Sequence, residues 1–88
     1  MKKFRVELKE TAARKLRKLP PCVSKRIVTA LKELENDPFP RGKKVKPFVG
    51  RPKTYRLRIG DYRIIYKVEE EIIFVLELLH RRDLDKFG

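Results

Sequence analysis

The sequence predicts an α+β domain with the order β-α-α-β-β-β, in which an N-terminal helical hairpin packs on an antiparallel sheet of about four strands. Apolar and charged residues alternate near the N-terminus and again after residue 54, as is typical of half-buried strands. Between these segments, apolar residues recur at helical spacing in two stretches separated by a proline pair. The 88 residues suffice for one domain, 1–88, and leave no room for a second core.

The first half of the chain is predicted to form one strand and two helices. Residues 3–9 alternate, and Thr11 is a candidate N-cap for the helix that follows. That helix should end before Pro20-Pro21, because the residue preceding a proline is disfavoured in the helical conformation. The second proline suits the first turn of the next helix, whose apolar stripe runs through residues 23–34. Two further prolines in residues 36–40 end that helix.

The second half is predicted to contain a connection and then three antiparallel strands. Residues 40–53 are rich in proline, glycine and lysine and are expected to form the connection. Residues 55–59 and 62–68 alternate on either side of a Gly60-Asp61 turn, which has the glycine-first pattern of a type II′ hairpin. Residues 72–79 are nearly all apolar, which favours a central strand covered on both faces.

Positive charge is concentrated in the middle of the chain. The protein has 24 lysine and arginine residues against 12 aspartate and glutamate residues, a formal net charge of +12. In residues 41–63 Asp61 is the single acidic residue, and the basic ones are Arg41, Lys43, Lys44, Lys46, Arg51, Lys53, Arg56, Arg58 and Arg63. Such a segment favours binding to a polyanion such as nucleic acid. The alternative, a lysine-rich solvated surface, normally mixes charges of both signs.

The hairpin turn also predicts which side chains share a face. A two-residue loop pairs Arg58 with Arg63 across the two strands. Their face also collects Arg56, Ile65 and Lys67. Like charges opposite one another destabilise a sheet, so the pair is expected to bind an anion, and phosphate fits because guanidinium binds it in a bidentate manner. The alternative is that the arginines extend into water or pair with Glu7 or the C-terminal acidic residues.

Other classes of site and location are disfavoured. One cysteine, Cys22, and one histidine, His80, cannot supply the four ligands of a transition-metal site, so no metal or other cofactor is expected. Cys22 is predicted to be an inert thiol. The start of the chain has no apolar stretch of signal-peptide length, and no segment reaches the length of a membrane span. The protein is therefore expected in the cytoplasm, away from membranes.

Two motifs resemble those of the RelE/ParE toxin superfamily. The run 55–66, YRLRIGDYRIIY, resembles the signature hairpin of these toxins, and HRRD at 80–83 resembles the motif that closes their domain. The resemblance implies a type II toxin that cleaves mRNA in the ribosomal A site without a metal, the substrate's own 2′-hydroxyl attacking the adjacent phosphate. It also implies ribosome and mRNA as partners, together with an acidic RelB-like antitoxin that wraps the toxin domain.

The same resemblance assigns candidate catalytic residues. Arg56 and Arg58 match the two basic positions of the first hairpin strand, Arg63 matches the arginine that stabilises the phosphate, and Arg81 matches the one after the last strand. His80 is a further candidate, for proton transfer. Well-known relatives have lysines at the first two positions, one of them assigned as general base, whereas an arginine cannot take up a proton at neutral pH.

Further RNA contacts are expected from residues around the motifs. They are Lys43, Lys44, Lys46, Arg51, Lys53, Lys67, Arg82 and Phe87. Phe87 is the aromatic residue nearest the position of the family's C-terminal tyrosine, which stacks on a base. Two alternatives stay open, a ParE-like inhibitor of DNA gyrase and a nucleic-acid-binding module without catalysis.

Overall fold

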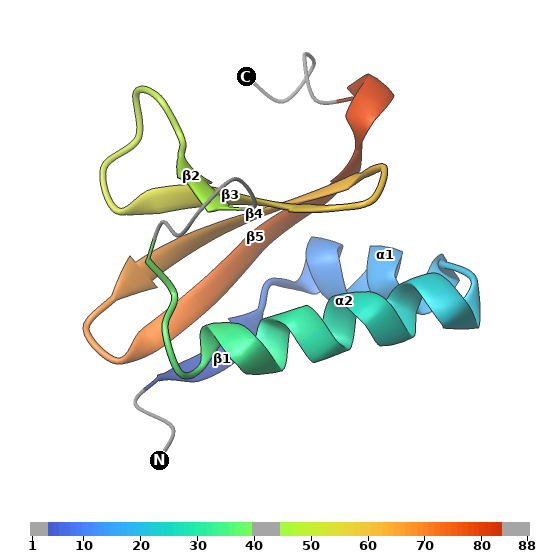
Figure 1. The fold of residues 1–88 in the computed structure, drawn as a ribbon, viewed down its shortest axis with the longest axis horizontal. Coiled ribbons are helices and arrows are strands. Elements are labelled where there is room, and N and C mark those ends of the chain that lie inside the picture. The colour runs from blue at the N-terminus through green and yellow to red at the C-terminus, as the bar shows by residue number, and fades with distance from the viewer. Residues whose placement is uncertain (1–3, 40–44, 84–88) are drawn as a thin grey trace.

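A computed structural model describes residues 4–39 and 45–83. The elements, in chain order, are β1 (Arg5–Leu8), α1 (Glu10–Lys18), α2 (Pro21–Leu34), β2 (Val45–Pro47), β3 (Thr54–Ile59), β4 (Tyr62–Glu69), β5 (Ile72–His80) and the 3-10 turn η1 (Arg81–Asp83). The strands form one sheet in the order β1-β5-β4-β3-β2, parallel between β1 and β5 and antiparallel elsewhere. Both helices cover the same face of this sheet (Figure 1). The predicted α+β class, the helical hairpin and the three antiparallel C-terminal strands are confirmed.

The sheet has five strands and is mixed, because β1 runs parallel to β5, whereas the sequence predicts an antiparallel sheet of about four strands. The additional strand, β2, lies inside the segment that was expected to be only a connection. It pairs Val45 with Leu57, and the Val45 side chain is buried. Three residues are too few to show an alternating pattern, and Pro47 argues against a strand except at a sheet edge, which is where β2 lies.

The main core lies between the helices and the face that they cover. Ala12, Ile27, Leu31 and Leu34 from the helices pack against Leu57, Ile64, Tyr66, Ile73, Val75 and Leu78 from the sheet. Tyr66 is fully buried, and its hydroxyl donates a 2.6 Å hydrogen bond to the carbonyl of Pro38. Burial raises the pKa of this phenol above its ordinary value. The bond fixes the segment after α2 to the centre of the sheet.

The first helix begins one residue earlier than its predicted cap. Lys9 occupies the N-cap position and makes no side-chain capping bond, so the prediction that Thr11 caps α1 is wrong. The N–H of Lys9 donates to the carbonyl of Val75, which prolongs the contact of β1 with β5 up to the helix. Pro21 stands in the first turn of α2, as predicted.

The strand β5 is only partly covered along its outer edge. β1 pairs with Ile72–Val75 and does not reach the second half of the strand. There the Glu77 carboxylate accepts hydrogen bonds from the N–H of Leu78, at 3.0 Å, and from the ammonium of Lys15, at 2.8 Å. The edge beyond Val75 therefore faces α1 across a side-chain bridge instead of a neighbouring strand.

Candidate active site

The β3–β4 hairpin has the register that its turn predicts. Arg58 lies opposite Arg63, Arg56 lies opposite Ile65, and Lys46 on β2 lies opposite Arg56. Opposed residues point to the same face of a sheet, so these basic side chains gather on the face that the helices leave uncovered. The turn itself requires Gly60, whose φ is +57°.

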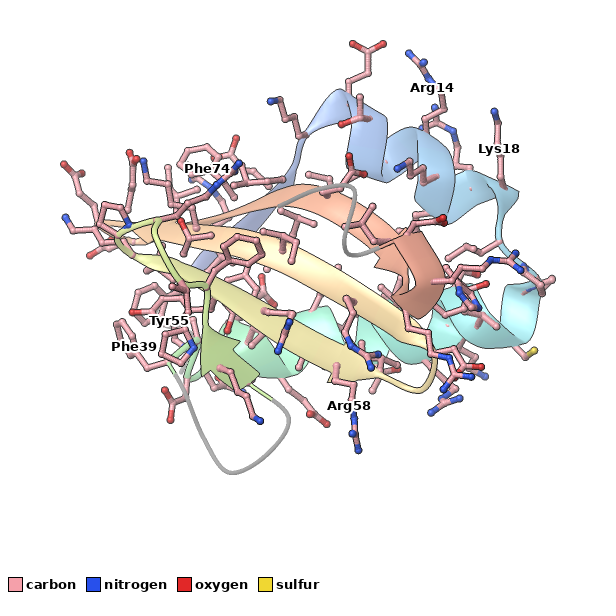
Figure 2. All side chains as sticks on the ribbon, turned by 90° about the horizontal axis from the view of Figure 1, so that it is seen from above. Arg14, Lys18, Phe39, Tyr55, Arg58 and Phe74 are labelled. Carbon is pink, nitrogen blue, oxygen red and sulfur yellow. The ribbon has the colours of Figure 1, made fainter. Side chains whose placement is uncertain are left out.

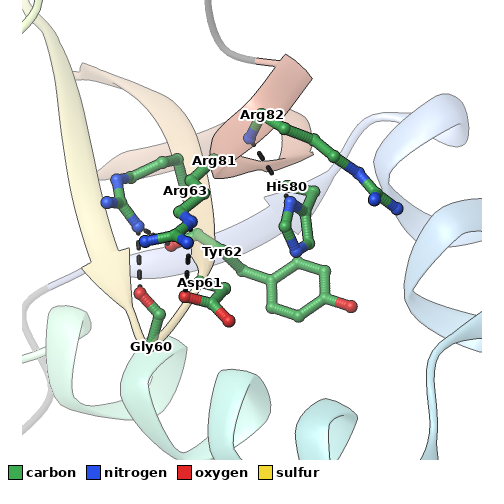
Figure 3. A network of polar contacts seen from close by, with 7 residues as sticks. All are labelled: Gly60, Asp61, Tyr62, Arg63, His80, Arg81 and Arg82. Atoms are coloured by element: carbon green, nitrogen blue, oxygen red, sulfur yellow. Dashed lines mark hydrogen bonds and ion pairs between the residues drawn. The ribbon is translucent and has the colours of Figure 1, made fainter.

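Arg63 is the centre of the arginine cluster, by which we mean Arg56, Arg58, Arg63 and Arg81. The pKa of Arg63 is lowered, first by partial burial and then by the positive charges of Arg58, Arg56 and Arg81, while Asp61 acts in the opposite direction. Its guanidinium donates 3.0 Å hydrogen bonds to the carbonyls of Gly60 and Tyr62 (Figure 3). The group is thus held over the turn by neutral acceptors and keeps its full charge.

Carboxylates neutralise little of this charge. Among the described residues the cluster has one ion pair, between the Nε of Arg81 and Asp61, at a distance of 3.7 Å with both side chains mostly exposed. The alternative partner Glu7 instead pairs with Arg5, at 3.4 Å. Arg58 and Arg63 therefore face each other without a carboxylate between them, in the part of the chain that the structure describes. This arrangement favours the arrival of an external anion.

An apolar floor lies beneath the cluster. Ile65, opposite Arg56, and Leu79, opposite Arg63, are both buried, and neither belongs to the main core on the helix side. Cations next to such a floor are poorly screened by water, so their attraction for a phosphate is stronger than it would be on an open polar surface.

His80 lies apart from the arginine cluster. Its ring packs edge-on against Tyr62, with centroids 5.3 Å apart, on the other side of the strand ends from Arg63 (Figure 3). The N–H of Arg82 donates to Nδ1 of His80 at 3.3 Å, so the neutral imidazole carries its proton on Nε2. In this state His80 is a hydrogen-bond donor toward solvent and has no lone pair available there to act as a base.

The remaining predicted RNA contacts have different surroundings. Lys46 joins the arginine face, whereas Lys67 is paired with Glu69 at 2.6 Å, a hydrogen bond that lowers the pKa of Glu69. Arg51 stacks on the ring of Phe48, 5.6 Å from its centroid.

Lys53 is exposed in the β2–β3 connection with a φ of 59°. Arg82 points away from Arg63 and Arg81 (Figure 3). Lys43, Lys44 and Phe87 lie outside the described residues.

One basic residue near the cluster was not predicted. The guanidinium of Arg26, on α2, lies beside the hairpin turn, with Nη1 3.6 Å and Nη2 3.7 Å from the point where a Cβ on Gly60 would stand. Only tertiary packing brings α2 against this turn, so the local sequence carries no signal for it. Arg26 extends the positive surface from the uncovered sheet face around the turn.

The structure also bears on the expectations about metal sites and membrane spans. Among residues 4–39 and 45–83, no three His, Cys, Asp or Glu side chains are grouped so that they could hold a metal ion. In the same residues, neither helix is long and apolar enough to cross a membrane.

Comparison with known proteins agrees with the fold and the motifs. The sequence profile of the family described as "ParE toxin of type II toxin-antitoxin system, parDE" matches residues 6–85. The chain is 32% identical over 82 residues to toxin RelE1 of Methanocaldococcus jannaschii, covering 90% of this chain and 91% of the relative.

Solved structures show the same likeness. The RelE–RelB complex from Pyrococcus horikoshii OT3 contains a chain that is 33% identical, with a TM-score of 0.79 and coverage of 90% of this chain and 96% of that one. A double mutant of E. coli toxin RelE in the free state has the same fold, with a TM-score of 0.80, at 22% identity and with coverage of 99% of this chain and 92% of that one. With a family profile matching nearly its whole length, the chain belongs to the RelE/ParE family of toxins from type II toxin–antitoxin systems.

Proposed function

We propose that this protein is a ribosome-dependent endoribonuclease that cleaves mRNA in the A site and thereby arrests translation in the cytoplasm. The observation that carries the proposal is the arginine cluster, in which four guanidinium groups share a single weak carboxylate contact within the described residues. Such a cluster matches the charge of a phosphodiester, and this charge increases in the transition state of cleavage.

The chemistry requires no metal or covalent intermediate. The 2′-hydroxyl oxygen of the RNA forms a bond to the neighbouring phosphorus, and the bond from phosphorus to the 5′-oxygen of the next nucleotide breaks. The products are a 2′,3′-cyclic phosphate and a free 5′-hydroxyl. Arg63 is fixed over the turn and stabilises the doubly charged phosphorane, while Arg56, Arg58 and Arg81 bind its other oxygens.

Proton transfer is assigned to groups other than the arginines. A guanidinium stays protonated at neutral pH and cannot remove the proton of the 2′-hydroxyl. His80 lies apart from the arginine cluster, and its Nδ1 already accepts a hydrogen bond from the N–H of Arg82, so we do not assign it the role of base. We therefore assign both the removal of the 2′-hydroxyl proton and the protonation of the leaving 5′-oxygen to water or to groups of the ribosome. The protein then contributes mainly charge and geometry.

An acidic, RelB-like antitoxin is the proposed regulatory partner. The relative from Pyrococcus horikoshii was crystallised with RelB, and the net charge of +12 makes pairing with an acidic protein electrostatically favourable. Binding over the arginine cluster would exclude RNA from it.

A translation extract supplies the test. The purified chain is added to programmed ribosomes and to the same mRNA without ribosomes, and new 5′ ends are mapped with and without EDTA. We expect cuts only on ribosomes, within the A-site codon, unaffected by EDTA and lost in Arg63→Ala. Lys32→Ala is the matched control, because it also removes one positive charge but lies on α2. Intact mRNA on programmed ribosomes incubated with folded wild-type protein would refute the proposal.

Inhibition of DNA gyrase is the second candidate. The family profile that matches the chain is that of ParE toxins, so family membership alone does not separate the two activities. A supercoiling assay run on the same preparations distinguishes them. Loss of supercoiling with intact mRNA would favour gyrase inhibition. Intact mRNA together with normal supercoiling would leave a nucleic-acid-binding module without catalysis.

A further inference from the structure

A groove of about 510 Å³ lies on the other side of the strand ends from the arginine cluster. It runs between the end of α1, the edge of β5 and the turn η1. The lining residues that matter here are Lys18, Leu19, Tyr62, Leu78, His80 and Asp83. Its volume falls within the range of about 300–1,000 Å³ that small-molecule sites occupy.

The fold keeps this groove open. β1 ends before the second half of β5, so no strand among the described residues fills the space beside it. The bridge from Lys15 to Glu77 holds α1 at side-chain distance from that edge. The groove is therefore part of the folded structure and needs no rearrangement to form.

The lining combines flat apolar surfaces with a few polar groups. Leu19 and Leu78 are apolar, and the rings of Tyr62 and His80 meet at an interplanar angle of 80°, so that one offers a face where the other offers an edge. A planar, weakly polar ligand that can stack fits such walls.

Polar groups at the rim are available to a ligand. In the described part of the chain, the Tyr62 hydroxyl, the Lys18 ammonium and the Asp83 carboxylate have no hydrogen bond or ion pair to another residue. The Nε2–H of His80 is likewise unused, because only Nδ1 is engaged. The hydroxyl, the imidazole N–H and the carboxylate can bond to the edge of a nucleobase that stacks on the rings. The ammonium can bind a neighbouring phosphate.

The groove adjoins the cluster through the chain itself. Tyr62 directly precedes Arg63, and His80 directly precedes Arg81, so the two sites use successive residues whose side chains point to opposite sides of the same strand ends (Figure 3). An RNA strand passing around the end of β5 can place one nucleotide in the groove and the neighbouring phosphate at the cluster.

We propose that this groove binds the nucleobase of a nucleotide that flanks the cleaved linkage. The stacking surface is supplied by Tyr62 and His80, the base edge is read by Asp83 and the imidazole N–H, and Lys18 binds a phosphate. The claim that the ligand is part of an RNA substrate rests on the proposed ribonuclease function. The claim that the groove binds a nucleotide is independent of that function.

Nucleotide titration tests the site directly. The full chain, labelled with ¹⁵N, is titrated with AMP, CMP, GMP and UMP, and with ribose 5-phosphate as the control that lacks a base. We expect amide shifts at Tyr62, His80 and Asp83 with nucleotides and not with the control, whose phosphate can shift Lys18 and the arginine cluster. Shifts of equal size at these three residues with ribose 5-phosphate, or nucleotide shifts confined to the arginine cluster, would overturn the proposal.

Variants separate stacking from charge. Tyr62→Leu should weaken nucleotide binding by about 5-fold or more, as loss of one aromatic stacking partner does. Phe39→Leu is the control, because it removes a half-exposed ring at the opposite end of the sheet from Lys18 (Figure 2). Lys18→Ala keeps the test valid if Tyr62→Leu fails to fold. It should weaken binding of nucleotides, while Lys32→Ala should not.

Cleavage mapping distinguishes failure of this inference from failure of the proposed function. Asp83→Asn should change which base is preferred next to the cut. Cleavage with unchanged base preference in both Asp83→Asn and Lys18→Ala would refute the groove and leave the ribonuclease intact. Nucleotide shifts in the groove without any mRNA cleavage would refute the ribonuclease and leave the nucleotide site.

Discussion

The two faces of the sheet are built on opposite principles. The face under the helices buries apolar side chains, and its one buried phenol has a hydrogen-bond partner. The other face brings Arg58 opposite Arg63 and Lys46 opposite Arg56, pairs that repel each other. The first face therefore supplies stability, and the second gives up a little of it to present positive charge. A domain of this size can do both because adjacent residues of one strand point to different faces.

The largest expected effect concerns the uncovered face. Arg63→Ala should lower the rate of mRNA cleavage by about 100- to 1,000-fold, the usual result of removing one fixed donor to a developing oxyanion. Its melting temperature should stay the same or rise, because a repelling charge is lost. Single-turnover kinetics measure the expected fall in cleavage rate, and thermal unfolding measures the melting temperature. A large fall in melting temperature would show that Arg63 is structural instead.

A substitution on the helix side should reverse this pattern. Ile64→Ala is expected to cost about 2–5 kcal/mol of unfolding free energy, because it leaves a cavity in the main core. Ile65→Ala is the matched comparison, since Ile65 is equally buried but lies on the arginine face outside that core. We expect a smaller loss there in urea titrations. Equal losses would mean that both faces contribute alike to stability.

The reach of the positive surface is tested at Arg26. Arg26→Ala should weaken RNA binding and reduce the slope of log affinity against log salt by about one, as expected for one lost phosphate contact. Lys32→Ala, on the same helix, should leave the slope nearly unchanged. A slope unaffected by Arg26→Ala would confine the RNA path to the sheet face.

Relief of repulsion should be measurable as stability. Arg58→Gln is expected to raise the unfolding free energy by about 0.2–1 kcal/mol, the range of cross-strand pairs. Sulfate should stabilise the wild type more than the variant, because it binds between two guanidinium groups. An Arg58→Gln protein that is less stable than the wild type at low salt would argue against repulsion.

The smallest effect concerns the bridge at the edge of β5. Burial alone would raise the pKa of Glu77, but hydrogen bonds from Lys15 and the N–H of Leu78, together with the charges of Lys15 and Lys9, lower it overall. A lowered carboxyl pKa contributes stability above the ordinary value of 4.5, and this contribution is lost as the pH falls through the lower, folded value. Lys15 is about half exposed, with 47% of its side chain accessible, so less than about 1 kcal/mol is expected. The difference in unfolding free energy between the wild type and Glu77→Gln, compared at pH 6 and at pH 3, measures this contribution.

Local patterns were sufficient to predict most of the fold and the centre of the site. The Gly60-Asp61 turn alone fixes the register that opposes Arg58 and Arg63, and the stripe in residues 23–34 fixes the buried side of α2. What the sequence could not show depends on packing between distant segments. The approach of Arg26 to Gly60 is one example, and the short strand β2 is another.

The same distinction holds for individual site residues. Lys67 was expected to contact RNA, but its partner Glu69 is two positions away, on the same side of the strand, and competes for it. His80 was grouped with the arginines by its place in the motif, yet its side chain alternates to the other side and packs on Tyr62. Alternation within the last strand could have indicated this, but the nearly continuous apolar run of β5 obscures it.

The two ends of the sheet bear on how this chain behaves at high concentration. At one border Pro47 lacks the N–H that a further strand would need. At the other border the strand β1 has only four residues, and beyond its end Glu77 occupies the N–H of Leu78 on β5 with its own carboxylate. Neither border offers a long row of vacant backbone donors within the described residues. Strand-to-strand aggregation between copies is thereby discouraged, and the large net positive charge adds mutual repulsion.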